Sequence, residues 1–371
     1  MPELGPALLT RLSEPTGFPR VTIHTPMVRA GSQVRQNRIH LTNGVSAAVE
    51  RLVDLGMAER DAQALLQPVT ELAHNDAEME RQLDGTSVFA DDSGYETITV
   101  PFQLSEQVEV GSRYAITQLV EPAVENGEYA ILALSLGGVG LYRASRFTAE
   151  LVELAGLPED LCYVLRYDQF EKSGHVHTTS ARGDSMHHGH GAGKDEHDAF
   201  VKRFVDAVRP VVTDWLRRER MPLVVIGLED AVGLYLKEND YDDTAAEHRF
   251  VDPHALSIDD VIALGWECMA PRYEQRRRDA IDRFHAADNR AVDVYGVLEA
   301  LLQGRAATLL VNPSREIRGT FDATTGGVHV DTDPKHVTEN LVDTAVARAL
   351  ATDTEIVVVE DEIESPAAIL Y

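Results

Sequence analysis

Apolar positions recur in blocks along the chain, and the first block predicts a strand, helices and further strands. An apolar strand pattern starts at Val21 and stops at Pro26, and an Arg-, Gln- and Asn-rich turn follows it. From about 40 to 82, apolar residues fall at helical spacing. Strand-like pieces follow at 86–90, 95–102 and 114–120. The polar segment 121–128, which contains Pro122 and Gly127, then marks a domain boundary.

The middle block opens with two strands joined by a glycine turn. Residues 129–135, YAILALS, form a buried-strand run, and GGVGLYR at 137–143 follows directly, which predicts a β-hairpin. Residues 148–154 are typical of a third strand. A polar stretch from 169 to about 194 comes next, and a loop of this length inside a domain is usually functional or disordered.

An amphipathic helix follows the polar stretch. Apolar side chains between Phe200 and Leu216 recur at a spacing of about 3.6 residues and form one stripe. Asp195 and Glu196 favour the N-terminus of this helix, arginines at 217–220 favour its C-terminus, and Pro210 is expected to kink or split it. Residues 221–230 predict a buried strand and 231–239 a short helix.

The last block alternates helices with strands. It begins near residue 250, after a polar segment, with helices expected over 257–287 and 291–303. A strand at 307–312, a hairpin around 322–327, a helix at 338–351 and strands at 354–360 and 367–371 follow. Such alternation is typical of an α/β sandwich. We therefore expect an α/β, multidomain chain with three domains, 1–125, 126–250 and 251–371, the first of them an α/β unit.

Charge changes the picture, because the formal net charge of −27 argues against binding to nucleic acid. Binding depends on local charge, however, and residues 15–49 contain no Asp or Glu. The candidate RNA-contacting residues are Arg29, Arg35 and Arg38 in this window, with Arg143 at the end of the hairpin and Arg146 after it. An ordinary polar loop is the alternative for the window.

A second basic group lies on the helix expected after 257. It contains Arg272, Arg276, Arg277, Arg278 and Arg283, with Asp and Glu between them. This group fits binding to the ribosome, and a solvated charged helix is the alternative.

Cysteine content and hydropathy bear on the compartment. No run of 18 apolar residues occurs, and the first residues lack the pattern of a secretion signal. Cys162 and Cys268 are far apart and have no CxxC spacing, so we expect neither a disulfide framework nor a cysteine zinc site. A cytoplasmic protein is the expectation.

The stretch HHGHGAGKDEHDAF, residues 187–200, carries the candidate chemistry. A phosphate loop would need glycine in place of His188 and Ser or Thr in place of Asp195, and the G-x-G-x-x-G spacing of dinucleotide sites also fails. Six histidines between 175 and 197 suit a metal, but no Cys or HExxH partner accompanies them. We therefore expect no cofactor and no resident metal. A flexible finger that contacts RNA fits best, and a surface loop without a role is the alternative.

The order of these segments resembles the bacterial members of the archaeo-eukaryotic release factor superfamily. The resemblance runs from about 20 to 371 and rests on VTIHTPMVRAGSQV, ILALSLGGVGLYR, the HGHGAGKDE loop before an amphipathic helix, PLVVIGLEDAVGLYLKEN, QGRAATLLVN and the closing AAILY. It implies an N-terminal α/β domain and a middle RNase H-like domain. It also implies a C-terminal α/β/α sandwich resembling kink-turn-binding ribosomal proteins.

The resemblance also implies where the working loop lies. In the release factors proper, a Gly-Gly-Gln loop of the middle domain hydrolyses peptidyl-tRNA, and a long helix follows it. The matching stretch here contains Gly189, His190, Gly191, Gly193 and Lys194. No Gly-Gly-Gln occurs in this chain, and Pelota-type relatives, which rescue stalled ribosomes, also lack it. The resemblance therefore implies a partner in the ribosome or tRNA, in rescue, hibernation or quality control.

Two other functions stay open at this point. The first is a peptidyl-tRNA or RNA hydrolase in which His188 or His190 is the general base, because the pKa of histidine suits proton transfer at neutral pH. The second is a module that binds a protein partner through the loop.

Overall fold

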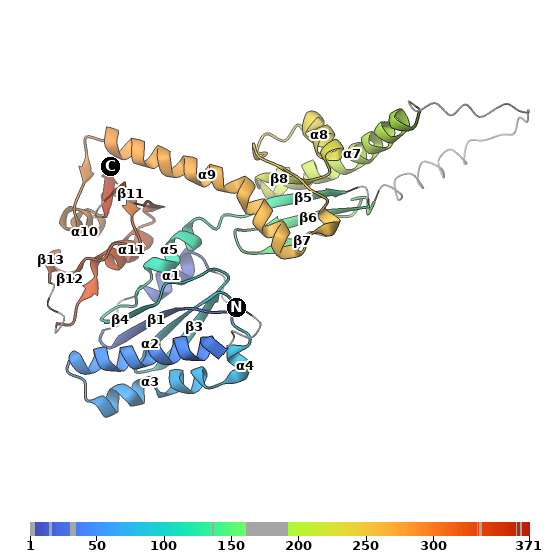
Figure 1. Cartoon of the computed structure of the whole chain (residues 1–371). Coiled ribbons are helices and arrows are strands. Elements are labelled where there is room, and N and C mark those ends of the chain that lie inside the picture. The colour runs from blue at the N-terminus through green and yellow to red at the C-terminus, as the bar shows by residue number, and fades with distance from the viewer. Residues whose placement is uncertain are drawn as a thin grey trace, which may run out of the picture. The chain divides into compact units, whose positions relative to one another are not determined.

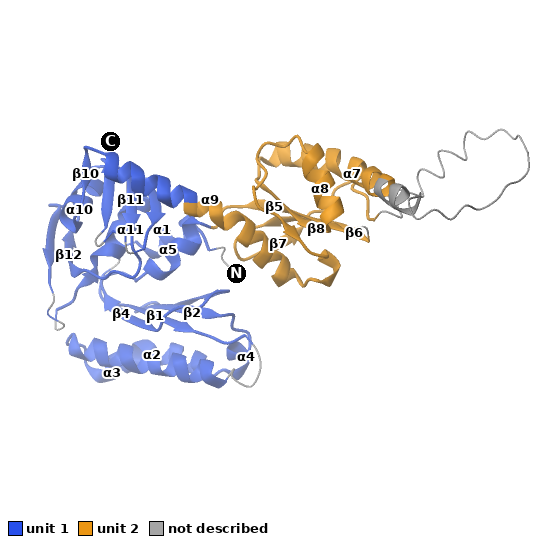
Figure 2. Ribbon diagram, turned by 45° about the horizontal axis from the view of Figure 1, so that its top comes forward, with its two compact units in different colours: residues 1–125, 275–371 blue, residues 126–274 orange. Residues whose placement is uncertain are grey.

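The computed structural model describes residues 4–14, 17–29, 35–135, 137–160, 192–331, 333, 336–360, 362–363 and 366–371. For residues 192–198 only the backbone is described. The chain is a mixed α/β, multidomain protein with four sheets among these residues (Figure 1). It forms two compact units, residues 1–125 with 275–371, and residues 126–274 (Figure 2). The division into three domains at 125 and 250 stays a prediction.

The first sheet of the discontinuous unit is antiparallel, with the order β3-β2-β1-β4. Its strands are β1 (Arg20–Pro26), β2 (Gly85–Asp91), β3 (Gly94–Val100) and β4 (Gln107–Gly111). The helices α2 (Arg35–Asp54) and α3 (Glu59–Ala73) lie side by side along one face, with the short α4 (Asp76–Met79) after them (Figure 1). An apolar core that includes Ile23, Leu52 and Leu66 fills the space between helices and sheet.

The prediction that residues 40–82 are helical is therefore confirmed, but the bounds of the helices differ from those predicted. The helix begins at Arg35, and a break at 55–58 separates α2 from α3. Gly56 lies in this break with φ +95°, a backbone conformation that glycine adopts without steric cost. The amide nitrogens of Gly56 and Met57 bond back to Val53 and Leu52, which closes the end of α2.

The strand expected at 114–120 is wrong, because Thr117–Val124 is helix α5. The strand of this region is instead β4, at Gln107–Gly111, which the sequence analysis did not predict. The helix α5 packs with α1 (Pro6–Leu12) on the second core of this unit.

That second core joins the first 125 residues to the last hundred. Phe89, Ile98 and Leu119 from the N-terminal part share it with Leu298 and Val346 from the C-terminal part. The C-terminal elements of this core include α10 (Val294–Leu302), β11 (Ala306–Val311) and α11 (Leu341–Ala351). Two segments far apart in sequence thus bury one continuous apolar core, which is the physical reason that they form one unit.

The C-terminal sheet has the order β10-β16-β11-β15, from β10 (Arg290–Ala291), β16 (Ala367–Leu370), β11 and β15 (Glu355–Val358). Only β11 and β15 are parallel in it. The end of α9 (Ile258–Ala286) covers its other face through Ala280 and Phe284. A small sheet of β12 (Arg318–Asp322), β13 (Gly327–Val330) and β14 (Glu339–Asn340) accompanies it, and the hairpin expected around 322–327 is confirmed.

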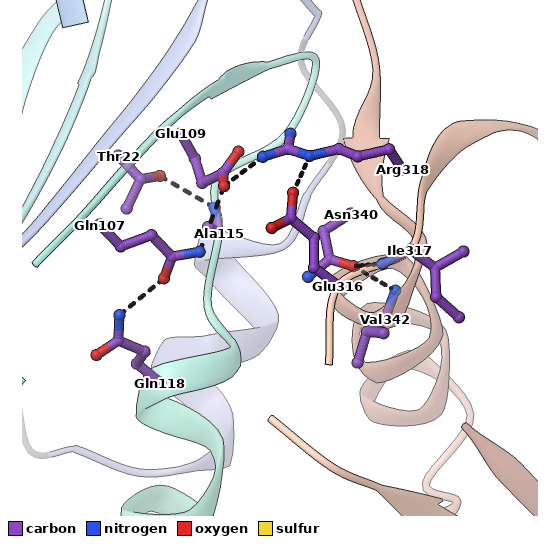
Figure 3. A network of polar contacts seen from close by, with 10 residues as sticks. All are labelled: Thr22, Gln107, Glu109, Ala115, Gln118, Glu316, Ile317, Arg318, Asn340 and Val342. Carbon is purple, nitrogen blue, oxygen red and sulfur yellow. Dashed lines mark hydrogen bonds and ion pairs between the residues drawn. The ribbon is translucent and has the colours of Figure 1, made fainter. Parts of the chain in front are cut away.

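Buried polar contacts join the same two parts of the chain (Figure 3). Arg318 pairs with Glu109, and Arg113 Nε lies 2.8 Å from Glu339 Oε2, with both side chains of the second pair at most a tenth exposed. Ion pairs this buried are strongly destabilising to break, because removal of one partner leaves an uncompensated charge. They fix the N-terminal sheet against the C-terminal segment.

The central unit carries a five-stranded sheet of order β7-β6-β5-β8-β9. Its strands are β5 (Tyr129–Ser135), β6 (Gly138–Ala144), β7 (Ala149–Leu151), β8 (Leu223–Gly227) and β9 (Arg249–Phe250). The strand β6 is antiparallel to both of its neighbours, β5 and β7, whereas β5, β8 and β9 run parallel to one another. The predicted hairpin of 129–143 is confirmed, whereas the third strand is shorter than expected.

Helices cover both faces of this sheet. The helix α7 (Ala192–Glu219) and α8 (Glu229–Glu238) pack on one face through Phe204, Val208 and Tyr235, and the start of α9 packs on the other. Gly265 in α9 allows close approach there, because a Cβ atom at this position would lie 2.4 Å from Ile131 Cδ1. The helix α7 continues through Pro210, so the residue does not split it.

Candidate functional site

The start of α7 is where the predicted working loop meets the described structure. His188, Gly189, His190 and Gly191 lie outside the described residues. The backbone of Gly193 and Lys194 belongs to the first turn of α7, which begins at Ala192, three residues before the predicted start. The buried apolar stripe of α7 then holds this helix on the sheet of the central unit.

Arg143, on β6, is engaged by carboxylates rather than free. Its guanidinium lies 2.9 Å from Glu128 Oε2 and 2.5 Å from Glu219 Oε2, and its Cζ lies 5.8 Å from the ring centre of Trp215. The hydrogen bond to Glu219 is the main reason that the pKa of Arg143 is raised. Two acidic partners therefore offset the charge that an RNA phosphate would need.

Arg146 lies among aromatic rings after β6. Its Cζ is 4.8 Å from the ring centre of Trp266 and 5.3 Å from that of Phe147. Trp266 in turn contacts Tyr273 at a centroid distance of 5.0 Å. Stacking of a guanidinium on aromatic faces stabilises its position. Arg143 and Arg146 thus lie in the same unit but have different surroundings.

The arginines of the acid-free window 15–49 differ in whether they have an acidic partner. Arg20 pairs with Asp91 in a largely buried contact, and Arg29 forms a two-pronged contact with Asp84 at 2.9 and 2.7 Å. Arg35 and Arg38 are exposed and make no side-chain hydrogen bond or ion pair with any residue that the structure describes. They lie three positions apart on α2 and therefore share a face.

The start of α2 is held rigidly by Asn37, which the sequence analysis did not single out. Its buried amide accepts a hydrogen bond from the Val28 nitrogen at 2.8 Å and donates to the carbonyl oxygens of Val28 and Met79. Because Asn37 lies between Arg35 and Arg38, this clamp fixes the helical turn from which both cations project. The backbone of Arg35 and Arg38 is therefore held in place, which lowers the part of the ordering cost of binding that comes from the backbone.

Four of the five arginines of the second basic group pair with neighbouring acids. Arg276 and Arg283 both contact Glu355, and Arg277 contacts Glu125 and Glu360. Arg272 pairs with Asp243, and Arg278 bonds to Gln275. The expected basic face of this helix is therefore a set of ion pairs, which agrees with the alternative of a solvated charged helix.

Strand β5 and the His, Cys, Asp and Glu side chains of the described residues bear on metal-dependent hydrolysis. All seven residues of β5 are buried, and none carries a carboxylate. Among the described residues no group of three or more His, Cys, Asp or Glu side chains could hold a metal ion.

No described helix is long and apolar enough to cross a membrane.

In comparison with known proteins, the central unit is similar to the archaeo-eukaryotic release factor proteins. The family model that matches is bacterial archaeo-eukaryotic release factor family 7, over residues 129–271. The resemblance predicted from the sequence is confirmed over residues 129–271, which is nearly the whole central unit of 126–274. No curated protein matches this chain.

Solved structures that are similar to this chain include three translation factors. The archaeal translation termination factor aRF1 shares 13% identity over 98% of this chain and 95% of that chain, with a TM-score of 0.23. Archaeal Pelota, in a ribosome-bound model with ABCE1, shares 17% over 77% of each chain, with a TM-score of 0.34. Dom34 of S. cerevisiae shares 10% over 77% of this chain and 79% of that chain, with a TM-score of 0.31.

Proposed function

We propose that this chain is a release-factor-like cytoplasmic protein that binds the ribosome or tRNA in rescue, hibernation or quality control. The observation that carries the proposal is the match of bacterial archaeo-eukaryotic release factor family 7 to residues 129–271. The absence of Gly-Gly-Gln from the sequence favours recognition without peptide release.

The domain assignment of the proposal follows the sheet of the central unit. In chain order its strands lie as third, second, first, fourth and fifth, with the first three antiparallel and the last two parallel to the first. This order supports an RNase H-like middle domain. The parallel β11–β15 pair with α10 and α11 supports a C-terminal α/β/α sandwich like those of kink-turn-binding ribosomal proteins.

The working tip of the proposal is the stretch 187–194. Its support is its place directly before α7, a helix of 28 residues that the sheet of the central unit holds by a buried apolar stripe. Gly189, Gly191 and Gly193 would allow close backbone approach to RNA, and Lys194 would supply a cation. His188 and His190 are the groups that a hydrolytic activity would use.

The RNA-contacting surface of the proposal centres on Arg35 and Arg38, since these cations have no acidic partner in the described structure. We expect Arg29, Arg143 and Arg146 to contact RNA as well, with a smaller contribution to the binding free energy. Arg29 and Arg143 must exchange a carboxylate for a phosphate, and the guanidinium of Arg146 is stacked on two rings.

The proposal is tested by replacing residues 187–194 with a Gly/Ser linker of equal length. Affinity of the fluorescently labelled protein for ribosomes is measured by anisotropy, and thermal stability is measured in parallel. We expect affinity to fall about tenfold or more while the melting temperature stays nearly unchanged. Unchanged affinity would refute the role of the tip, and no binding by the wild-type chain would refute the function itself.

A further inference from the structure

A cavity of about 370 Å³ lies in the discontinuous unit, at the end of β1, β2 and β3 that meets α1. It is lined by charged and aromatic side chains from segments far apart in sequence. They include Arg11, Glu14, Arg20, Asp91, Tyr95, Glu96 and Tyr114. Its volume falls within the range of small-molecule sites. The release-factor proposal makes no use of this cavity.

Internal contacts hold the inner wall of the cavity, and among its polar atoms the buried Arg20 Nε makes no hydrogen bond with the described residues. Arg20 pairs with Asp91 and donates to Tyr114 Oη at 2.9 Å, and Tyr114 donates to Asp91 Oδ2 at 2.9 Å. The backbone and hydroxyl of Ser93 both donate to Asp91 Oδ1. The guanidinium of Arg20 also lies over the ring of Tyr114, 5.0 Å from its centre. This wall is therefore preorganised, and the charges of Arg20 and Asp91 offset each other.

On the rim, Arg11 and Glu96 form a second, more exposed pair. Two hydrogen bonds of 2.7 and 2.5 Å join the guanidinium to the carboxylate, and the side chains are 53% and 37% exposed. Because Arg11 is bound to Glu96 and Arg20 to Asp91, the two arginines of the lining are each offset by a carboxylate.

Two groups of the lining remain uncommitted. The carboxylate of Glu14 makes no hydrogen bond or ion pair with any described residue, although its charge adds to the rise in the pKa of Arg11. With two arginines and three carboxylates in its lining, the cavity keeps one net negative charge. Tyr95 is 42% exposed, and its ring makes no contact with another ring or cation in the described part of the chain. A carboxylate without an ion pair and an aromatic face without a ring or cation contact, both judged among the described residues, are the two kinds of group that together recognise an organic ammonium ion.

We propose that this cavity binds a small organic ammonium ion, a primary or secondary alkylamine, between the Glu14 carboxylate and the Tyr95 ring. The ammonium group takes the place of a missing partner for Glu14, and its alkyl chain lies on the ring of Tyr95. The net charge of −27 raises the local concentration of any such cation around the protein. An anionic ligand is disfavoured, since both arginines are paired and the lining is negative.

The test is calorimetric titration of the full chain with spermidine at fixed ionic strength. We expect one saturable site. Glu14→Gln weakens it about fivefold or more, which corresponds to the roughly 1 kcal/mol of one exposed charge contact. Tyr95→Leu weakens it about threefold, as expected for an exposed cation–π contact, and Tyr95→Phe, which keeps the ring, leaves it unchanged.

Two controls separate this site from general attraction to an acidic protein. Glu50→Gln removes one exposed carboxylate of α2, outside the cavity, and should leave affinity unchanged. Hexaamminecobalt(III) has the charge of spermidine without an alkyl chain and should not compete at equal concentration. Equal affinities in Glu14→Gln and Glu50→Gln, unsaturable binding, or equal competition by the cobalt complex would overturn the proposal. Saturable binding of neutral guanosine in place of spermidine would also overturn it.

Discussion

The carboxylate of Asp343 accepts a hydrogen bond from the backbone nitrogen of Ile116 at 2.7 Å, across 227 positions of sequence. The same oxygen accepts a second hydrogen bond from Thr117 at 2.8 Å. Asp343 lies in the first turn of α11, and these two nitrogens lie at the start of α5. One buried side chain of the C-terminal segment therefore provides the N-terminal cap of a helix in the N-terminal segment.

Replacement of Asp343 should destabilise the discontinuous unit. Asp343→Ala leaves two buried N–H groups without an acceptor, so we expect a loss of about 2–4 kcal/mol of unfolding free energy. Asp343→Asn keeps one carbonyl oxygen for these donors and should cost about half as much. Chemical denaturation followed by tryptophan fluorescence and circular dichroism measures both. An Asp343→Ala loss of less than about 0.5 kcal/mol would contradict the capping role.

Protonation of His24, a fully buried residue of β1, should make the stability of the folded state depend on pH. Burial lowers its pKa to about 4 from an ordinary 6.5, and its Nδ1 lies 2.8 Å from Ser87 Oγ. The folded state binds this proton less readily than the unfolded state. Stability from neutral His24 is therefore complete above pH 6.5 and is lost as pH falls toward 4, by up to about 3 kcal/mol. Urea unfolding from pH 7 to 4 measures the slope, and His24→Gln should flatten it. An equally steep slope in His24→Gln would assign the dependence to other groups.

The close contact between β5 and β8 should make Gly227 intolerant of any side chain. A Cβ atom at this position would lie 2.2 Å from the carbonyl oxygen of Leu134, a backbone atom that cannot turn aside. We expect Gly227→Ala to cost about 1–3 kcal/mol, in the range of overpacked sites. Gly233→Ala in α8 is the matched control, because nothing lies within 4 Å of its Cβ, and it should stabilise the helix by up to about 1 kcal/mol. Equal melting temperatures for the two variants would contradict this packing.

Salt should stabilise this protein, because a net charge of −27 repels itself at low ionic strength. The screening length falls from about 10 Å at 0.1 M to about 3 Å at 1 M salt. We expect the melting temperature to rise between these two KCl concentrations. A flat or falling melting temperature would show that the internal ion pairs outweigh the general repulsion.

Elements with a strong local pattern could be predicted from the sequence. Two predictions are confirmed, the apolar stripe of α7 from Phe200 to Leu216 and the strand YAILALS. The helix buries one face and the strand buries both faces, and in each case the local pattern of apolar residues is enough to predict the element. The segment 114–120 could not be predicted in this way. Its apolar and β-branched composition favours a strand, whereas the Asp343 cap and the shared core with the C-terminal segment stabilise a helix.

The ion-pair partners of the candidate arginines could not be predicted from the sequence either. Composition showed that residues 15–49 lack acids, but not that Asp84 and Asp91, which lie outside this window, pair with Arg29 and Arg20. Sheet pairing brings Arg20 to Asp91, because β1 and β2 are antiparallel neighbours. Among the described arginines of this window, only Arg35 and Arg38 have no acidic partner in the described part of the chain.

The central claim, binding to the ribosome, is tested most directly by co-sedimentation with 70S ribosomes over a salt series. Wild type is compared with Arg35→Ala/Arg38→Ala, and with Arg60→Ala/Arg81→Ala, which removes the same charge from arginines that lie beside Asp61 and Glu78. We predict that wild type and the second variant pellet with ribosomes. The first variant should bind more weakly, with its salt dependence reduced by about two phosphate contacts. Wild-type protein that stays in the supernatant at every salt concentration, with vacant and tRNA-loaded ribosomes alike, would contradict the claim.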